Sequence, residues 1–402
     1  MALSGSIIVL LLVAAAVALI APRARIPYTV ALVVAGLLLG VVPLLHPPPL
    51  TKELLFAVFL PGLLFEASVQ LEAAEFWRNR VVIFSLALPA VALSTVIVAS
   101  ALVLLLPFAG TTIGWGAAFV FATLIAATDP IAVVALVRTL GAPVRLAVLI
   151  EGESLLNDGT AAVSFATAVA FVLGAEPNAG TLVIDFIYAI AIAIVVGGGV
   201  GLVTRTLLAW LNDAMVMITI TTAAAYGSFL IAEDMHASGV IAAVTAGLLS
   251  GTKATQRAIP NESRAVLRAF WDYVAFALNS IVFLLIGFQA GVGKLLTEWR
   301  LIVAAFLIVT LTRLVVTYAV VRTVSNPRTF PPRWTPVLAW SGLRGSLAMV
   351  LALSLPPETV HRDEIVTMTI GVVVLSILIQ GLTVGPLLRR LGLERSAREQ
   401  HA

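Results

Sequence analysis

The chain has 402 residues, of which 60% are hydrophobic and only 11% are charged, and its mean hydropathy is +1.08. Soluble domains have about 45–50% apolar and about 25% charged residues, so this composition excludes a water-soluble globular protein and predicts an integral membrane protein. The formal net charge of +3 indicates no nucleic-acid partner, and the absence of cysteine excludes disulfides, thiolate catalysis and cysteine metal sites.

Apolar runs close to the length of a membrane-crossing helix recur along the chain, with short polar breaks between them. This pattern predicts an all-α polytopic membrane protein in which residues 1–402 form one transmembrane domain of about thirteen helices. Their expected ranges are 3–21, 27–45, 53–70, 81–106, 115–137, 147–174, 183–204, 214–232, 238–251, 266–290, 299–321, 335–356 and 364–387. The first run has no basic segment before it, so it is expected to remain as a helix rather than to be removed as a signal peptide.

The distribution of basic residues agrees with this order of helices. Most of the 24 Lys and Arg residues follow odd-numbered helices, and only Lys52, Lys294, Arg300 and Arg362 follow even-numbered ones. Basic residues concentrate in cytoplasmic loops. We therefore expect a multi-pass protein of the cell membrane with its N-terminus outside and a short cytoplasmic tail, 388–402.

Two of the expected helices contain helix breakers. The fifth holds AATDPIAVV, in which Pro130 removes a backbone donor and disfavours helical geometry at the preceding residue. The twelfth holds WSGLRGSLAM, with Gly342 and Gly345 on either side of an arginine. These helices run in opposite directions, which is typical of inverted-repeat transporters. The expected repeats cover about 1–175 and 214–390, with a linker helix at about 183–204.

Asp129 precedes Pro130 in the fifth helix. Aspartate is a good N-cap and proline is favoured at the first helical position, so one interpretation is that Asp129 only starts a half-helix. The break also frees carbonyl groups around Thr128 at membrane depth, where irregular backbone is tolerated only beside a cavity or within protein. A carboxylate beside free carbonyls offers the oxygen ligands that hard cations prefer, and we favour this second interpretation.

The first half of the sixth helix contains EGESLLNDGTA, an acidic stretch between apolar segments. Ser154 and Asp158 are four residues apart and share a helix face with Glu151, whereas Glu153 and Asn157 share the neighbouring face. Glu151 is expected at the cytoplasmic interface. Asp158 lies deeper, and a buried ionisable group is costly unless it is paired, protonated or solvated, so its position indicates a function.

Further charges are expected inside the membrane. Glu66, in LLFEA, either reaches the interface or lies buried, and the sequence leaves both open. Arg313 and Arg344 have no acid near them in sequence, so they need partners from other helices. The two guanidinium groups would face four carboxylates, and this excess of negative charge predicts a site for a cation or for protons. Those carboxylates are Glu66, Asp129, Glu153 and Asp158.

Five stretches together resemble a known family. They are EGESLLNDGTA, ATDPIAVVAL, LLFEA, FWDYVAFALNSIVFLLIGFQ and SGLRGSLAMVLALSLP. The chain resembles NhaP-type Na+/H+ antiporters of the monovalent cation:proton antiporter superfamily over nearly its whole length. The resemblance implies an NhaA-like antiporter fold with inverted repeats and two broken crossing helices, a homodimer in the lipid bilayer, and elevator-like alternating access. It also implies a role in sodium transport and pH homeostasis.

The resemblance implies a set of ion-binding residues. Asp129 and Asp158 would bind the cation, with the Ser154 hydroxyl and the Thr128 main chain as further ligands. Glu66 would contribute directly or through water. The cation would be Na+, with Li+ as a second substrate, and it would compete with H+ for the buried carboxylates.

Four more residues receive roles by the same resemblance. Asn157 occupies the place that a second aspartate takes in electrogenic relatives, which implies electroneutral one-for-one exchange. Glu153 would form a structural ion pair, for which Arg313 is the favoured partner. Arg344 would compensate the broken twelfth helix.

Other classes remain to be compared. A K+/H+ antiporter of the same fold would carry the same residues. An intramembrane aspartyl protease also uses two buried aspartates, but its second motif is expected to read Gly-x-Gly-Asp, which LLNDG does not. A cation channel would be expected to show short repeated filter motifs, and none is visible. The chain is therefore expected to be a transporter rather than an enzyme, and to need no cofactor.

Overall fold

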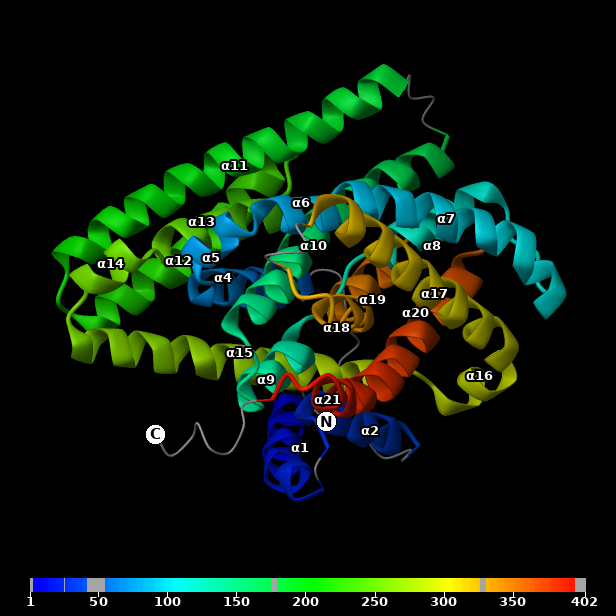
Figure 1. The fold of residues 1–402 in the computed structure, drawn as a ribbon, viewed down its shortest axis with the longest axis horizontal. Coiled ribbons are helices and arrows are strands. Elements are labelled where there is room, and N and C mark those ends of the chain that lie inside the picture. Colours follow the sequence, from blue (N-terminus) through cyan, green and yellow to red (C-terminus); the bar gives the residue numbers. More distant parts are fainter. Residues whose placement is uncertain (1–2, 25, 42–54, 175–178, 326–329, 395–402) are drawn as a thin grey trace.

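The computed structural model describes residues 3–24, 26–41, 55–174, 179–325 and 330–394, and throughout these ranges the chain contains helices and no strand (Figure 1). The first half contains α1 (Leu3–Ala24), α2 (Tyr28–Gly40), the π-helical turn η1 (Leu55–Phe59), α4 (Leu60–Gln70), α5 (Ala73–Arg78), α6 (Arg80–Ala87), α7 (Pro89–Leu105), the 3-10 turn η2 (Leu106–Ala109), α8 (Trp115–Leu124), α9 (Ile131–Thr139) and α10 (Val144–Val172).

The second half contains α11 (Ala179–Trp210), α12 (Ala214–Asp234), α13 (Gly239–Ser250), α14 (Lys253–Ala258), α15 (Asn261–Gln289), α16 (Val292–Thr297), α17 (Trp299–Val324), α18 (Trp334–Trp340), α19 (Ser346–Leu353), α20 (Arg362–Leu375), the π-helical turn η3 (Ser376–Gln380) and α21 (Gly381–Arg390). Every expected range contains helix in the part of the chain that is described. Seven helical segments there are long and apolar enough to cross a membrane, and the total of thirteen crossings stays a prediction.

The helices form two bundles, each packed mainly on itself. The α15 bundle contains α1, α2, α4 and α11–α15, and the α10 bundle contains α5–α10 and α17–α21. Small residues bring the helices of the α15 bundle close together. A methyl group added at Gly36 of α2 would overlap the backbone of α15, and one added at Gly197 of α11 would overlap the backbone of α13. Such contacts are the usual means by which membrane helices approach each other.

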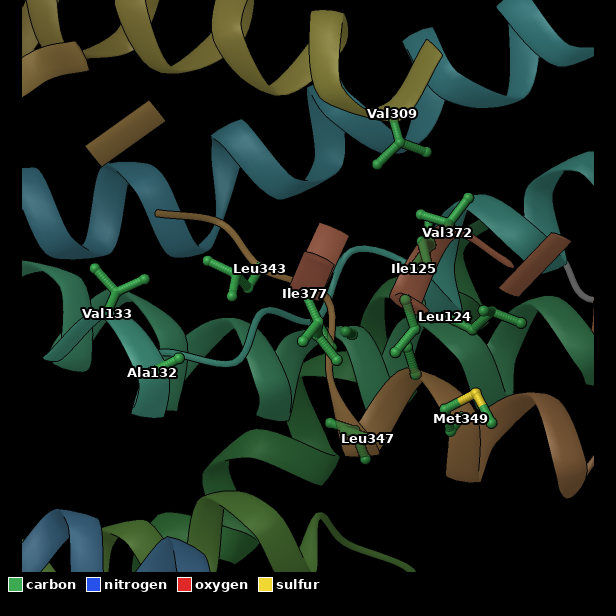
Figure 2. Close-up of a cluster of buried hydrophobic side chains, with 14 of the residues drawn as sticks. Leu124, Ile125, Ala132, Val133, Val309, Leu343, Leu347, Met349, Val372 and Ile377 are labelled. Carbon is green, nitrogen blue, oxygen red and sulfur yellow. The ribbon is translucent and has the colours of Figure 1, made fainter. Parts of the chain in front are cut away.

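Both expected breaks are present in the α10 bundle. Residues 125–130 separate α8 from α9, and residues 341–345 separate α18 from α19. The two unwound segments meet where the Asp129 amide donates a hydrogen bond to the Leu343 carbonyl, at 2.7 Å. In Figure 2 these segments pass each other among buried apolar side chains, including Ile125, Leu347 and Ile377. The surrounding protein excludes lipid, and irregular backbone is tolerated there for that reason.

Candidate ion-binding site

The unwound segment between α8 and α9 is hydrogen-bonded to α10 through Thr128. The Ser154 hydroxyl donates to the Thr128 carbonyl. The Asn157 side-chain amide donates to the Thr128 hydroxyl at 2.7 Å, and its carbonyl oxygen accepts from the Thr128 backbone N–H at 3.3 Å. These bonds replace the helical partners that the chain loses at Pro130. Asn157 is fully buried and uncharged, and its two bonds to Thr128 hold the unwound segment against α10.

Asp129 is buried beside the N-terminal ends of two half-helices. Its Oδ1 accepts from the Ile131 N–H at 3.0 Å, at the start of α9. Its side chain also lies against Gly345, directly before α19, so closely that a methyl group at Gly345 would overlap it. Helix N-termini carry partial positive charge and favour a carboxylate. The bond to Ile131 accounts for one oxygen only, so capping does not use the whole of this group.

Asp158 is the carboxylate with an unused buried oxygen. It lies on α10 one turn after Ser154, and its Oδ1 is buried without a hydrogen-bond partner among the described residues. A buried acceptor left without a partner carries most of its desolvation cost. This oxygen therefore requires a proton, a water molecule or a cation.

A cavity of about 70 Å³ lies where these groups meet. Its polar lining comes from both bundles, and among the described residues no Lys, Arg or His lines it. A space of this size holds a cation with a few water molecules. The polar residues are Glu66, Thr128, Asp129, Ser154, Asp158, Asn279 and Ser346.

Asn279 of α15 and Ser346 of α19 have no role in the sequence-based prediction, yet both face the cavity. Their sequence signal is weak, because each is a single neutral polar residue in a stretch that also carries charged groups. Ser346 is the first residue of α19, immediately after the break. Both oxygen-bearing side chains add to the donors around the space between Asp129 and Asp158.

Glu66 reaches the cavity from the opposite bundle. It is half-buried on α4, and its Oε1 accepts a hydrogen bond from the Gln70 amide at 2.5 Å. The sequence leaves open whether Glu66 reaches the interface or lies buried, and the structure places it in the cavity wall. The cavity therefore lies between the two bundles, and both bundles contribute carboxylates to it.

Glu153 forms a two-pronged ion pair with Arg313, at 2.6 and 2.7 Å. Arg313 is the partner that the sequence favours. The same guanidinium donates to the Leu338 carbonyl at 3.1 Å, near the C-terminal end of α18. Glu153 also accepts from Asn157 at 3.3 Å. This pair consumes one carboxylate and one arginine, so neither contributes net charge to the cavity.

Arg344 compensates a different helix from the one predicted. The sequence predicts that Arg344 compensates the broken twelfth helix, on which it lies. This is wrong. Its guanidinium donates to the carbonyls of Ile125, Ala126 and Ala127, at the C-terminal end of α8. The two unwound segments cross, so a side chain on one reaches the free carbonyls of the other. Arg344 therefore provides hydrogen bonds and positive charge to the free carbonyls at the C-terminal end of α8, in the first of the two broken helices.

Glu151 lies outside the cavity. It is buried, and Arg138 of α9 donates to it at 3.0 Å. The side chain of Arg138 is about half exposed, so this pair stands at the wetter end of α10. Of the acidic stretch in α10, Asp158 alone is both in the cavity and without a basic partner.

The donor set is made of oxygen atoms of several kinds. Three carboxylates line the cavity, with hydroxyls from Ser154 and Ser346 and the unwound backbone at Thr128. Within the described ranges, no three acidic or imidazole side chains converge to form a ready-made metal cage. Hard cations prefer oxygen ligands. A site with this mixture of oxygen ligands suits a hard cation.

Residues 7–390 match the sequence profile of the family described as "Sodium/hydrogen exchanger, transmembrane". The chain belongs to the sodium/hydrogen exchanger family. It is 34% identical to the Na+/H+ antiporter NhaG of Bacillus atrophaeus over 96% of this chain and 74% of that protein. It is 37% identical to the Na+/H+ antiporter ApNhaP of Aphanothece halophytica over 92% of this chain and 70% of that protein. Exchangers are transporters, in agreement with the expectation that the chain is not an enzyme.

The fold of this exchanger-family chain is also that of a solved structure. The sodium proton antiporter MjNhaP1 of Methanocaldococcus jannaschii superposes with a TM-score of 0.80, over 97% of this chain and 98% of that one, at 18% sequence identity. The predicted antiporter fold with broken crossing helices is thereby confirmed. Assembly into a dimer and the division into inverted repeats stay predictions.

Proposed function

We propose that this protein is a secondary active antiporter that exchanges Na+, and also Li+, for H+ across a membrane. The observation that carries the proposal is the cavity at the helix crossing, which has three carboxylates and no basic side chain of the described residues in its wall. A buried space with this excess of acid is neutralised only by what enters it. Family membership supports sodium and protons as the two species.

The cation is held by Asp129 and Asp158, which line the cavity from the break between α8 and α9 and from α10. Ser154 and the Thr128 carbonyl supply further oxygen ligands, and the bond between them orients both groups. Glu66 reaches the ion from the α15 bundle, directly or through water. Cation and proton compete for the same oxygens, so the site closes with one or the other bound.

Exchange is electroneutral, with one ion for one proton. Asn157 supports this stoichiometry because it adds no titratable group: its amide is engaged with Thr128 and Glu153. The ion pair of Glu153 with Arg313 is structural. Alternating access then carries one cation in one direction and one proton in the other, so the occupied site has the same charge in both steps.

The alternative functions have less support. The named relatives are Na+/H+ antiporters, which gives no support to K+/H+ exchange. An aspartyl protease has no support from the family. We propose further that the protein lies in the cell membrane as a homodimer with its N-terminus outside, and that it uses no cofactor and no nucleic-acid partner.

The test is cation-dependent dissipation of a pH gradient in proteoliposomes that contain the purified protein. Na+ and Li+ are expected to collapse the gradient, and K+ is expected to have little effect. A gradient that collapses equally with K+ would favour the K+/H+ alternative. Cation flux without opposing proton flux would refute antiport and favour a channel.

A further inference from the structure

A second, larger cavity lies beside the candidate site. This cavity, the vestibule, has a volume of about 680 Å³ and is lined by charged residues that include Glu151, Arg138 and Arg268. Gln70 lines the vestibule, whereas Glu66, one turn earlier on α4, lines the site cavity. The boundary between the two cavities is therefore formed by neighbouring side chains of one helix.

Gln70 is hydrogen-bonded to two carboxylates at once. Its Nε2 donates to Glu66 Oε1 at 2.5 Å and to Asp272 Oδ1 of α15 at 2.6 Å. A side-chain amide nitrogen has two protons, and both are engaged here. The amide therefore fixes the orientation of Glu66 and fastens α4 to α15.

Glu66 and the two aspartates of the cavity belong to different helix bundles. Asp129 and Asp158 belong to the α10 bundle, and Glu66, Gln70 and Asp272 belong to the α15 bundle. The side chains of Glu66 and Asp272 therefore keep their relation to each other when one bundle moves against the other.

The charged surroundings of Glu66 lie on the vestibule side. Through the amide of Gln70, Glu66 is linked to Asp272 of α15. Glu151 and Arg138 line the vestibule, and Asp272 lies one turn after Arg268, which also lines it. Of the three carboxylates in the site cavity, Glu66 is the one hydrogen-bonded to a described residue of the vestibule wall, Gln70.

We propose that Gln70 and Asp272 are positioning residues that hold Glu66 at the mouth of the site, where it receives the cation from the vestibule and passes it to Asp129 and Asp158. The inference rests on the exchange function proposed above. Because Glu66 stays with the α15 bundle, its contribution is available only while the site opens to the vestibule. The role of Gln70 is therefore confined to one face of the membrane.

The experiment measures the KM for Na+ separately at the two faces, in right-side-out and inside-out membrane vesicles. Gln70→Met keeps the length of the side chain but removes both donors. We expect the KM to rise about tenfold at the vestibule face, the size of one lost hydrogen bond. At the opposite face it should stay within about twofold, and the maximal rate should change little at either face.

Two variants of Asp272 separate positioning from charge, and neither alters α4. Asp272→Asn keeps an acceptor oxygen for Gln70 and should retain the wild-type KM. Asp272→Leu should raise the KM at the vestibule face, and the Gln70→Met/Asp272→Leu double variant should be no worse than Gln70→Met alone. Gln256→Leu is the matched control, because Gln256 lines the same vestibule but its side-chain amide donates to a backbone carbonyl, that of Gly251.

A KM change of equal size at both faces, or none at either face, would overturn the proposal. A KM increase in Asp272→Asn as large as in Asp272→Leu would also overturn it, since that result would assign the effect to the charge of Asp272. Wild-type vesicles without Na+-dependent proton movement would instead refute the proposed function, so the two failures are distinguishable.

Discussion

The buried ion pair between Glu153 and Arg313 makes a quantitative prediction. Glu153→Gln preserves the shape of the side chain but leaves the guanidinium buried without a counter-charge. Two unit charges about 4 Å apart interact by about 4 kcal/mol at an effective dielectric constant of about 20. Breaking one side of a buried pair costs about 3–5 kcal/mol in proteins. We therefore expect this variant to lose about 3–5 kcal/mol of stability.

The measurement is a double-mutant cycle. Arg313→Met should destabilise by a similar amount, because it leaves the Glu153 carboxyl group buried without its basic partner. The double variant should be far more stable than the sum of the two single changes predicts, since removing both charges together removes the unpaired charge. Midpoints of heat-induced loss of monodisperse protein in detergent give the comparison.

The control is an exposed pair in the same chain. Glu72 and Lys253 lie 3.7 Å apart with both side chains substantially exposed, so Glu72→Gln should cost less than about 1 kcal/mol. Single changes at Glu153 and Arg313 that simply add in the double variant would refute the reasoning, because additivity means that the two groups do not interact.

Three further predictions concern the site. Asp158→Asn and Asp129→Asn remove a charged ligand at nearly constant shape and should abolish exchange in proteoliposomes while the protein remains monodisperse; surviving exchange would exclude that residue as the shared site. If one proton leaves for each ion bound, the apparent Na+ affinity should weaken about tenfold per pH unit on the acidic side of the titration, and a flat affinity in transport assays would favour separate sites. Wild-type exchange should not respond to a membrane potential clamped with valinomycin and K+, and a severalfold change in its rate would contradict electroneutrality. Asn157→Asp should lower activity without making exchange electrogenic, because the nearby guanidinium of Arg313 does not release a proton.

Much of the fold is encoded locally and could be predicted. Helix length follows from apolar runs, and the break at Pro130 follows from the missing N–H and the restricted residue before it. Gly342 and Gly345 mark the second break in the same way. Glu153 and Arg313 could be matched because few buried ions of either sign are present in the sequence.

The contacts that depend on the crossing could not be predicted. Arg344 lies on one broken helix and serves the other, and nothing in its neighbours along the sequence indicates the carbonyl of Ile125. Gln70 and Asn279 are neutral polar residues on helices with polar faces, and such residues usually face water or headgroups. Their roles become visible only when α4, α15 and α19 surround one space.

The arrangement of the half-helix ends explains why the cavity must be filled. Arg344 occupies the C-terminal end of α8, and Arg313 is shared between Glu153 and the end of α18. Neither arginine is therefore free to neutralise Asp129 or Asp158. An empty cavity with both aspartates ionised would be costly to close within the membrane. A site that closes only when a cation or a proton occupies it couples the two movements, and this coupling distinguishes an exchanger from a leak.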